Sequence, residues 1–145
     1  MNSEISIVVR FAKRDDLKAI LQFDHHTRHE VLESKIGLYE IIVAERCGEI
    51  IGYLKLEYIW SKLPYISLII LKTEFRGKGI GTLMLNYLVD FLKMNGFGTL
   101  LSSSQVDEVP PQMWHRKKGF VECGFLSGIN EGGVGEVFFM MSLDE

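Results

Sequence analysis

Cysteine and proline are scarce in this chain of 145 residues. The two cysteines, Cys47 and Cys123, provide neither a disulfide framework nor the spacing of a metal site. The three prolines are not accompanied by Gly- or Ser-rich stretches, and the sequence has no internal repeat. Nothing therefore indicates a linker, and we predict a single domain over residues 1–145, long enough to bury a sizeable core.

Clusters of positive charge and long apolar runs are also missing. The formal net charge is −3 and no basic patch reverses it, which argues against a nucleic-acid partner. No apolar run approaches the length of a membrane span, and Met1-Asn2-Ser3-Glu4 does not resemble a signal peptide. We expect a cytoplasmic protein without a nucleic-acid or membrane partner, whose mild acidity suits a cationic substrate.

Hydrophobic periodicity predicts strands and helices along the whole chain. The expected strands are residues 5–11, 38–46, 49–59, 66–71, 99–104, 120–126 and 134–143. Helices are expected after Asp15, within residues 25–35, over residues 80–95 and after Pro110. Cys47-Gly48 indicates a hairpin, and Pro64 is expected to break the chain before the central strand. The order β-α-α-β-β-β-α-β-α-β-β mixes hairpins with a parallel crossover, which predicts an α+β fold.

The most informative stretch joins the apolar run at residues 66–71 to a strongly periodic helix. The run is short, rich in β-branched residues and bounded by polar ones, which predicts a buried strand. Apolar residues then recur at Ile80, Met84 and Leu88, which is helical spacing. Because the first turn of a helix presents N–H groups without intrahelical acceptors and a favourable dipole, we expect a phosphate group to bind here.

Three glycines, Gly77, Gly79 and Gly81, alternate between that strand and that helix and let the backbone approach a ligand closely. A Walker loop is excluded, because Gly77-Lys78 is followed by glycine instead of Ser or Thr. A dinucleotide fingerprint is excluded, because Thr82 stands where its third glycine is required. The remaining pattern, Arg76-x-x-Gly79-x-Gly81, resembles the acetyl-CoA signature of the GNAT superfamily of N-acyltransferases.

The resemblance covers nearly the whole chain after Ile5 and implies a GNAT-type mixed β-sheet with helices on both faces. It also implies acetyl-CoA as the cosubstrate. In this family the backbone of the central strand binds the pantetheine arm, and residues 76–82, which we call the glycine corner, bind the pyrophosphate. The cofactor-binding residues implied are Ile69, Leu71, Arg76, Gly77, Lys78, Gly79, Ile80, Gly81 and Thr82.

The chemistry implied is acetyl transfer from a thioester to an amine, which must first lose a proton because alkyl amines have a pKa near ~10.4. The family often places an acidic group where Glu57 lies, which makes it a candidate base, and Tyr65 is an alternative. The family acid that protonates the leaving thiolate is often a Tyr; here His115 holds that position, and a pKa near ~6.5 permits donation. The alternative interpretation of His115 is a surface or packing histidine.

Other positions narrow the chemistry further. Glu108 and Pro111 stand where the family often has Asn and Ala, so the Asn contact to the pantetheine arm is not expected. His25 and His29 have the spacing to share a helix face, but no further residue at metal spacing supports them. We therefore predict that no metal takes part and that these histidines line the acceptor pocket. An acyl relay through Cys123 is an alternative to direct transfer.

The sequence predicts an acetyl-CoA-dependent N-acetyltransferase that transfers the acetyl group directly to an amine acceptor, either a small molecule or a protein amine. One alternative is a noncatalytic acyl-CoA-binding module. Another is a peptide-binding adaptor that uses only the fold. Hairpins at the sheet edges are compatible with a homodimer.

Overall fold

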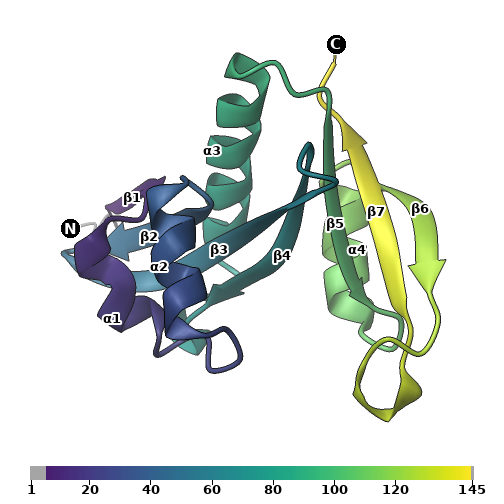
Figure 1. Ribbon diagram of the computed structural model, residues 1–145, viewed down its shortest axis with the longest axis horizontal. Helices are drawn as coiled ribbons and strands as arrows, with labels where there is room; N and C mark the ends of the chain where they lie inside the picture. The colour runs from purple at the N-terminus through teal and green to yellow at the C-terminus, as the bar shows by residue number, and fades with distance from the viewer. Residues whose placement is uncertain (1–5, 145) are drawn as a thin grey trace. The chain divides into compact units, whose positions relative to one another are not determined.

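The computed structural model describes residues 6–144, and Ile5, the predicted start of the first strand, lies outside them. Strands and α-helices follow one another in the predicted order (Figure 1). The strands are β1 (Ile7–Phe11), β2 (Ile41–Arg46), β3 (Glu49–Ile59), β4 (Leu63–Leu71), β5 (Thr99–Gln105), β6 (Val121–Leu126) and β7 (Glu136–Ser142). The helices are α1 (Leu17–Ile20), α2 (His29–Gly37), α3 (Ile80–Met94) and α4 (Val109–Lys117), with short 3-10 turns η1 (Arg14–Asp16), η2 (Thr73–Phe75) and η3 (Glu131–Gly133).

The strands form one mixed sheet in the order β1-β2-β3-β4-β5-β7-β6. β2 is antiparallel to both β1 and β3, and β7 is antiparallel to both β5 and β6. β4 and β5 are parallel, with Tyr65 opposite Leu101. Hairpins and a parallel crossover therefore share one sheet, and the predicted α+β class is confirmed.

By their internal contacts the residues group into two compact units. The first unit contains the described residues up to Leu56 together with Leu68–Leu88. The second unit contains Glu57–Ser67 and the chain from Val89 onward. The boundaries fall inside β3, β4 and α3, so these elements contribute residues to both units. The single domain expected from the sequence stays a prediction.

Helices cover both faces of the strands in the first unit. On one face, Val43 of β2 packs in a buried cluster with Leu32 of α2. The neighbouring Ile42 points to the opposite face, where it pairs with Phe11 of β1. Phe11 meets Tyr87 of α3 edge to face, with 5.5 Å between the ring centres. α2 and α3 therefore lie on opposite faces of this part of the sheet, as the family resemblance implied.

In the second unit, α4 covers one face of β5 and β7. His115 of α4 bonds to Ser102 of β5 and stacks on Phe139 of β7, with 4.8 Å between the ring centres. Because successive strand residues alternate, Ser103 and Phe138 point to the opposite face, where they are direct cross-strand partners. The two faces of this unit therefore carry different polar groups.

The two hairpins near the middle of the chain differ in how well the sequence predicted them. Cys47 and Gly48 both have positive φ, 52° and 81°, which is the turn expected for a two-residue hairpin. The expected break at Pro64 is wrong, because Pro64 is buried near the start of β4. Trp60 and Ser61, with φ of 57° and 60°, make the turn instead. Proline is tolerated near the first residue of a strand, where its missing N–H disrupts little of the ladder.

Candidate functional site

The glycine corner links the end of β4 to the start of α3. Gly77 and Gly79 have φ of +74° and +83°, in the region that favours glycine. A Cβ built at either position would meet no atom of the chain within 4 Å. Packing within the protein therefore does not require glycine here; the backbone conformation does, and it leaves the space beside the corner open.

The start of α3 lies directly behind these glycines. The first hydrogen bond of the helix runs from Leu83 N–H to Gly79 O at 3.2 Å. By helix geometry, the N–H groups of residues 80–82 therefore have no acceptor within the helix. Ile80 is buried, whereas Arg76 and Lys78 are exposed. Anchored by Ile80, the helix thus presents its first N–H groups beside two exposed cations, an arrangement suited to a phosphate.

Three of the residues predicted to bind the cosubstrate meet at the end of β4. Ile69, Leu71 and Arg76, together with Ile70, line an open hollow of about 230 Å³. The Arg76 Nε donates to the carbonyl of Leu71 at 3.2 Å, so this side chain ties the corner back to the strand. The hollow is therefore continuous with the residues expected to hold the pyrophosphate and the pantetheine arm.

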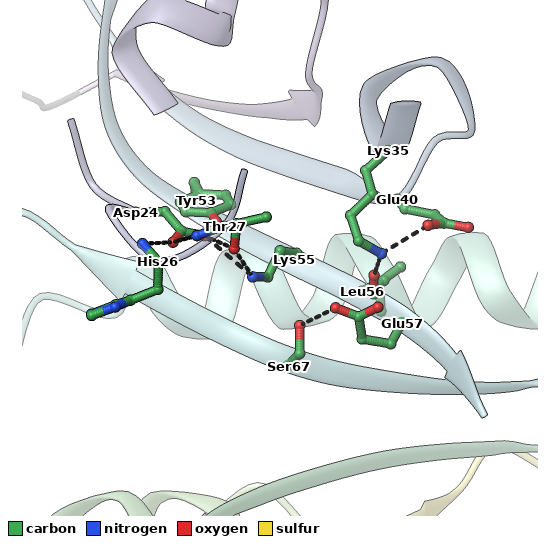
Figure 2. A network of polar contacts seen from close by, with 10 residues as sticks. All are labelled: Asp24, His26, Thr27, Lys35, Glu40, Tyr53, Lys55, Leu56, Glu57 and Ser67. Carbon is green, nitrogen blue, oxygen red and sulfur yellow. Dashed lines mark hydrogen bonds and ion pairs between the residues drawn. The ribbon is translucent and has the colours of Figure 1, made fainter. Parts of the chain in front are cut away.

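The loop between α1 and α2 is held by a buried carboxylate that the sequence did not single out (Figure 2). Asp24 is 4% exposed. Its Oδ1 accepts the N–H groups of His26 and Thr27, each at 3.0 Å. Its Oδ2 accepts from the Thr27 hydroxyl at 2.8 Å, from the Tyr53 hydroxyl, and from Lys55 Nζ at 3.2 Å. Asp24 thereby joins the loop to two residues of β3.

These contacts also explain the charge state of Asp24. Burial by itself would raise the pKa of the Asp24 carboxyl. Hydrogen bonds from Tyr53, Thr27, His26 and Lys55 outweigh that effect and hold the pKa of Asp24 well below its ordinary value. Asp24 is therefore ionised at neutral pH and neutralises the Lys55 ammonium, whose side chain is 12% exposed.

The variant Asp24→Asn should lower the free energy of unfolding by about 3 kcal/mol at pH 7, because it removes a buried negative charge that accepts hydrogen bonds from Tyr53, from Lys55 and from two N–H groups of the loop. A carboxyl with a depressed folded-state pKa stabilises the fold above its unfolded pKa of about 3.9 and loses that contribution as the pH falls through the folded value. The difference in the free energy of unfolding between wild type and variant should therefore stay constant from about pH 5 to 8 and become smaller at lower pH. Urea unfolding across that range measures it.

Asp15→Asn is the matched control, since Asp15 is exposed at the start of the first unit. It should change the free energy of unfolding by less than about 0.5 kcal/mol. Equal effects of the two variants would show that the Asp24 network has no special role in stability.

Lys35, near the C-terminal end of α2, is a buried cation. Lys35 Nζ donates to Glu40 Oε1 at 3.0 Å and to the Leu56 carbonyl at 2.6 Å (Figure 2). The expectation that His25 and His29 share a helix face is wrong, because α2 begins at His29 and His25 lies in the preceding loop. The loop before α2 and the C-terminal end of α2 are thus each bonded to β3, while both histidines stay exposed.

Within residues 6–144, no three His, Cys, Asp or Glu side chains are placed to hold a metal ion. Over the same residues, no helix combines the length and the apolar character required to cross a membrane.

His115 is 3% exposed and uses both ring nitrogens. Nδ1 lies 2.8 Å from the Pro111 carbonyl, which can only accept, so Nδ1 carries the proton. In the neutral ring Nε2 then accepts the hydroxyl proton of Ser102 at 2.7 Å. Burial lowers the pKa of His115, although its bond to Pro111 opposes the shift. His115 is therefore held in one neutral tautomer between α4 and β5.

The two candidate bases lie in the second unit. Glu57 is half-buried and accepts a hydrogen bond from the Ser67 hydroxyl at 3.2 Å (Figure 2). Tyr65 is also half-buried, and its hydroxyl lies 2.7 Å from the Ser103 hydroxyl. Burial raises the pKa of Tyr65, and the hydrogen bond with Ser103 opposes that shift. The negative charges of Glu136 and Glu57 raise the pKa further. Tyr65 is therefore a neutral phenol at physiological pH.

Comparison with known proteins identifies a family whose model matches most of this chain. The family model described as the acetyltransferase (GNAT) family matches residues 10–120. A streptothricin acetyltransferase of Streptomyces lavendulae is 29% identical over 90 residues, which cover 61% of this chain and 48% of that protein. The chain therefore spans about half the length of the curated relative it matches.

Solved structures share the fold at lower sequence identity. An N-acetyltransferase from Staphylococcus aureus matches with a TM-score of 0.82 at 21% identity, covering 96% of this chain and 99% of that one. The protein yncA from Salmonella typhimurium, solved with its cofactor acetyl-CoA, matches with a TM-score of 0.78 at 20% identity, covering 97% of this chain and 95% of that one. These likenesses support the fold that the strand order indicates.

Proposed function

Because the chain belongs to the acetyltransferase (GNAT) family, we propose that it transfers the acetyl group of acetyl-CoA directly to the nitrogen of an amine. The observation that carries the proposal is the glycine corner. There, Gly77 and Gly79 adopt positive φ beside the start of α3, with open space where a ligand would approach. The acceptor is an amine of a small molecule or of a protein.

The residues of the corner divide the binding of acetyl-CoA among them. Arg76 and Lys78 supply positive charge, and the N–H groups at the start of α3 donate to the phosphates. The pantetheine arm forms hydrogen bonds with the backbone of β4 at Ile69 and Leu71, in the way that an added half-strand would. The full set proposed is Ile69, Leu71, Arg76, Gly77, Lys78, Gly79, Ile80, Gly81 and Thr82.

Acetyl transfer needs three things from the protein. The ammonium form of the acceptor must lose a proton before its nitrogen can attack the thioester carbonyl. The oxyanion of the tetrahedral intermediate needs an N–H donor, for which we propose the backbone of β4. The carbon–sulfur bond then breaks and the thiolate takes up a proton. Direct attack is favoured over a relay through Cys123, because partial burial and Glu122 raise the pKa of that thiol.

His115 as the acid for the thiolate stays a prediction, and its contacts favour a different role. The single proton of the neutral ring is bonded to the Pro111 carbonyl, and Nε2 is turned toward Ser102. We propose that His115 positions α4 against β5 and β7, and that the thiolate is protonated by the attacking nitrogen or by water.

The noncatalytic acyl-CoA-binding module remains the second proposal. It is favoured by the same observation, since both nitrogens of His115 are engaged inside the second unit. Such a module would bind acetyl-CoA at the glycine corner but would not release CoA in the presence of an amine.

A panel of amines tests the proposed function. Purified protein with acetyl-CoA should release the CoA thiol when polyamines, amino acids, aminoglycoside-type antibiotics or peptides with a free N-terminus are added in turn. At least one class should raise thiol release at least about 100-fold above acetyl-CoA hydrolysis, because a positioned base alone contributes about that factor. The assay contains EDTA, because we expect no metal to take part.

Binding of acetyl-CoA with no amine-dependent thiol release would support the module instead. Absence of acetyl-CoA binding would contradict both proposals. A cytoplasmic location and a homodimer are further proposals, which fractionation of source cells and sedimentation of the purified chain would test.

A further inference from the structure

A continuous chain of hydrogen bonds crosses three elements of the second unit. The Tyr65 hydroxyl of β4 lies 2.7 Å from the Ser103 hydroxyl of β5. The Ser103 hydroxyl donates to Glu136 Oε2 of β7 at 2.5 Å. The other oxygen of Glu136 accepts from Asn130 Nδ2 at 2.9 Å. Both carboxylate oxygens of Glu136 are thus bonded, and the carboxylate is held in one orientation.

The strand registers place this chain on one face of the sheet. Tyr65 is opposite Leu101, and Gln105 is opposite Glu136. Residues 65, 101, 103, 105 and 136 therefore share a face, which is opposite to the face of Ser102 and α4. Tyr65 also stacks on Phe138, with 5.6 Å between the ring centres, so its ring is fixed as well.

The donors and acceptors that each side chain can offer determine which group donates in every hydrogen bond of this chain. An ionised Glu136 can only accept, so Ser103 must donate its one hydroxyl proton to it. Ser103 then has only lone pairs to offer Tyr65, so Tyr65 donates to Ser103. The Tyr65 oxygen keeps its own lone pairs, and these can accept a proton from a further donor such as an ammonium group.

We propose that Tyr65, Ser103 and Glu136 form a proton relay that deprotonates the acceptor amine, with Glu136 as the terminal base. This inference rests on the proposed function. One proton passes from the ammonium nitrogen to the Tyr65 oxygen, the Tyr65 proton passes to Ser103, and the Ser103 proton passes to Glu136. The result is a neutral amine and a protonated Glu136. The amine then attacks the thioester, the carbon–sulfur bond breaks, the thiolate takes the second nitrogen proton, and Glu136 returns its proton to water.

The charges around the relay suit this direction. Glu136 and Glu57 both act on Tyr65, and both raise its pKa. Two carboxylates near one phenol attract a cationic acceptor and oppose a tyrosinate, so Tyr65 passes a proton on and does not keep a negative charge. His115, on the other face, also senses the charge of Glu136, but burial keeps its ring neutral. Glu57 itself accepts a hydrogen bond from Ser67.

Three substitutions interrupt the relay at different links: Tyr65→Phe, Ser103→Ala and Glu136→Gln. Each should lower kcat/KM for the acceptor about 100-fold or more at neutral pH, with acetyl-CoA affinity and thermal unfolding near wild type. Ser103→Ala is the sharpest variant, because it removes the link and keeps both the phenol and the carboxylate.

The pH profile distinguishes a lost base from structural damage. Without a base, the rate follows the fraction of amine that is already neutral, so the deficit should shrink about tenfold per pH unit as the pH approaches the amine pKa near ~10.4. A structurally damaged variant would keep the wild-type profile at a lower level. There are two matched controls. Glu122→Gln removes the negative charge of an exposed residue that pairs with Arg116, and Ser142→Ala replaces an exposed serine at the end of β7. Both should keep wild-type kcat/KM.

A spectroscopic readout tests the relay without a known acceptor. NMR of protein labelled at the tyrosine ring carbon that bears the hydroxyl should show a lower Tyr65 pKa in Glu136→Gln, because a neighbouring negative charge is removed. Tyr65→Phe assigns the signal. An unchanged Tyr65 titration in Glu136→Gln, or wild-type kcat/KM in Ser103→Ala, would overturn the relay even if the wild type acetylates amines. Failure of the wild type to acetylate any amine would overturn the proposed function, and the relay as a catalytic device with it.

Discussion

Acetyl-CoA binding should be lost in the variant Gly79→Asp, with Kd raised at least about 100-fold, or ~2.7 kcal/mol. The new carboxylate would stand where the pyrophosphate is expected, and two like charges about 4 Å apart near a protein surface repel by up to about 4 kcal/mol. The fold should survive, because a side chain at this position meets no atom of the chain within 4 Å. Aspartate is also among the residues that tolerate positive φ. Calorimetric titration with acetyl-CoA measures the loss.

Two controls separate charge, strain and position in this experiment. Gly79→Asn has nearly the same size and the same tolerance for positive φ without the charge, so it should weaken binding less than Gly79→Asp. Gly96→Asp introduces the same charge and a similar strain after the end of α3, at φ +81° with no atom within 4 Å. It should leave acetyl-CoA affinity unchanged. Wild-type affinity in a folded Gly79→Asp variant would mean that the pyrophosphate does not bind at the glycine corner.

The variant His115→Ala should lower the free energy of unfolding by about 3 kcal/mol. The substitution leaves a cavity beside Phe139 and removes the partners of the Ser102 hydroxyl and the Pro111 carbonyl. Because burial lowers the folded-state pKa of His115, the unfolded chain binds its proton more readily. The advantage of wild type over the variant should therefore shrink as the pH falls below about 6.5. Lys117→Ala, exposed on the same helix, is the control and should change stability by less than about 0.5 kcal/mol.

Kinetics of the same variant test the two roles considered for His115. A positioning residue should leave kcat nearly unchanged at temperatures where the variant is folded. The acid role predicts instead a fall in kcat of about 100-fold at wild-type acetyl-CoA affinity, with partial recovery in His115→Tyr. We expect the first result from the contacts, and the second would restore the acid assignment. Measurement requires the acceptor identified by the amine panel.

Part of this protein could be predicted from its sequence because the information is local. The period of the apolar residues determined the order of strands and helices, and the glycine spacing predicted a ligand-binding corner after the central strand. The hairpin at Cys47-Gly48 was also evident, since a two-residue turn depends on the conformations of its own residues. Pro64 was misjudged, because whether a proline breaks a strand depends on the ladder bonds at that position, which the sequence does not reveal.

The polar groups at the candidate site were decided by tertiary structure alone. Asp24 and Lys55 lie far apart in the chain, as do Ser103 and Glu136, and no periodicity relates the members of either pair. Their pairing follows from strand register and from the loop that precedes α2, which place buried polar groups where each must find a partner. The family resemblance, together with the helix expected after Pro110, located His115 correctly on the last helix, but not its orientation. His115 is buried between α4 and the sheet because its side of α4 packs inward. Which side of α4 packs inward depends on the apolar side chains of the helix and of the strands beneath it.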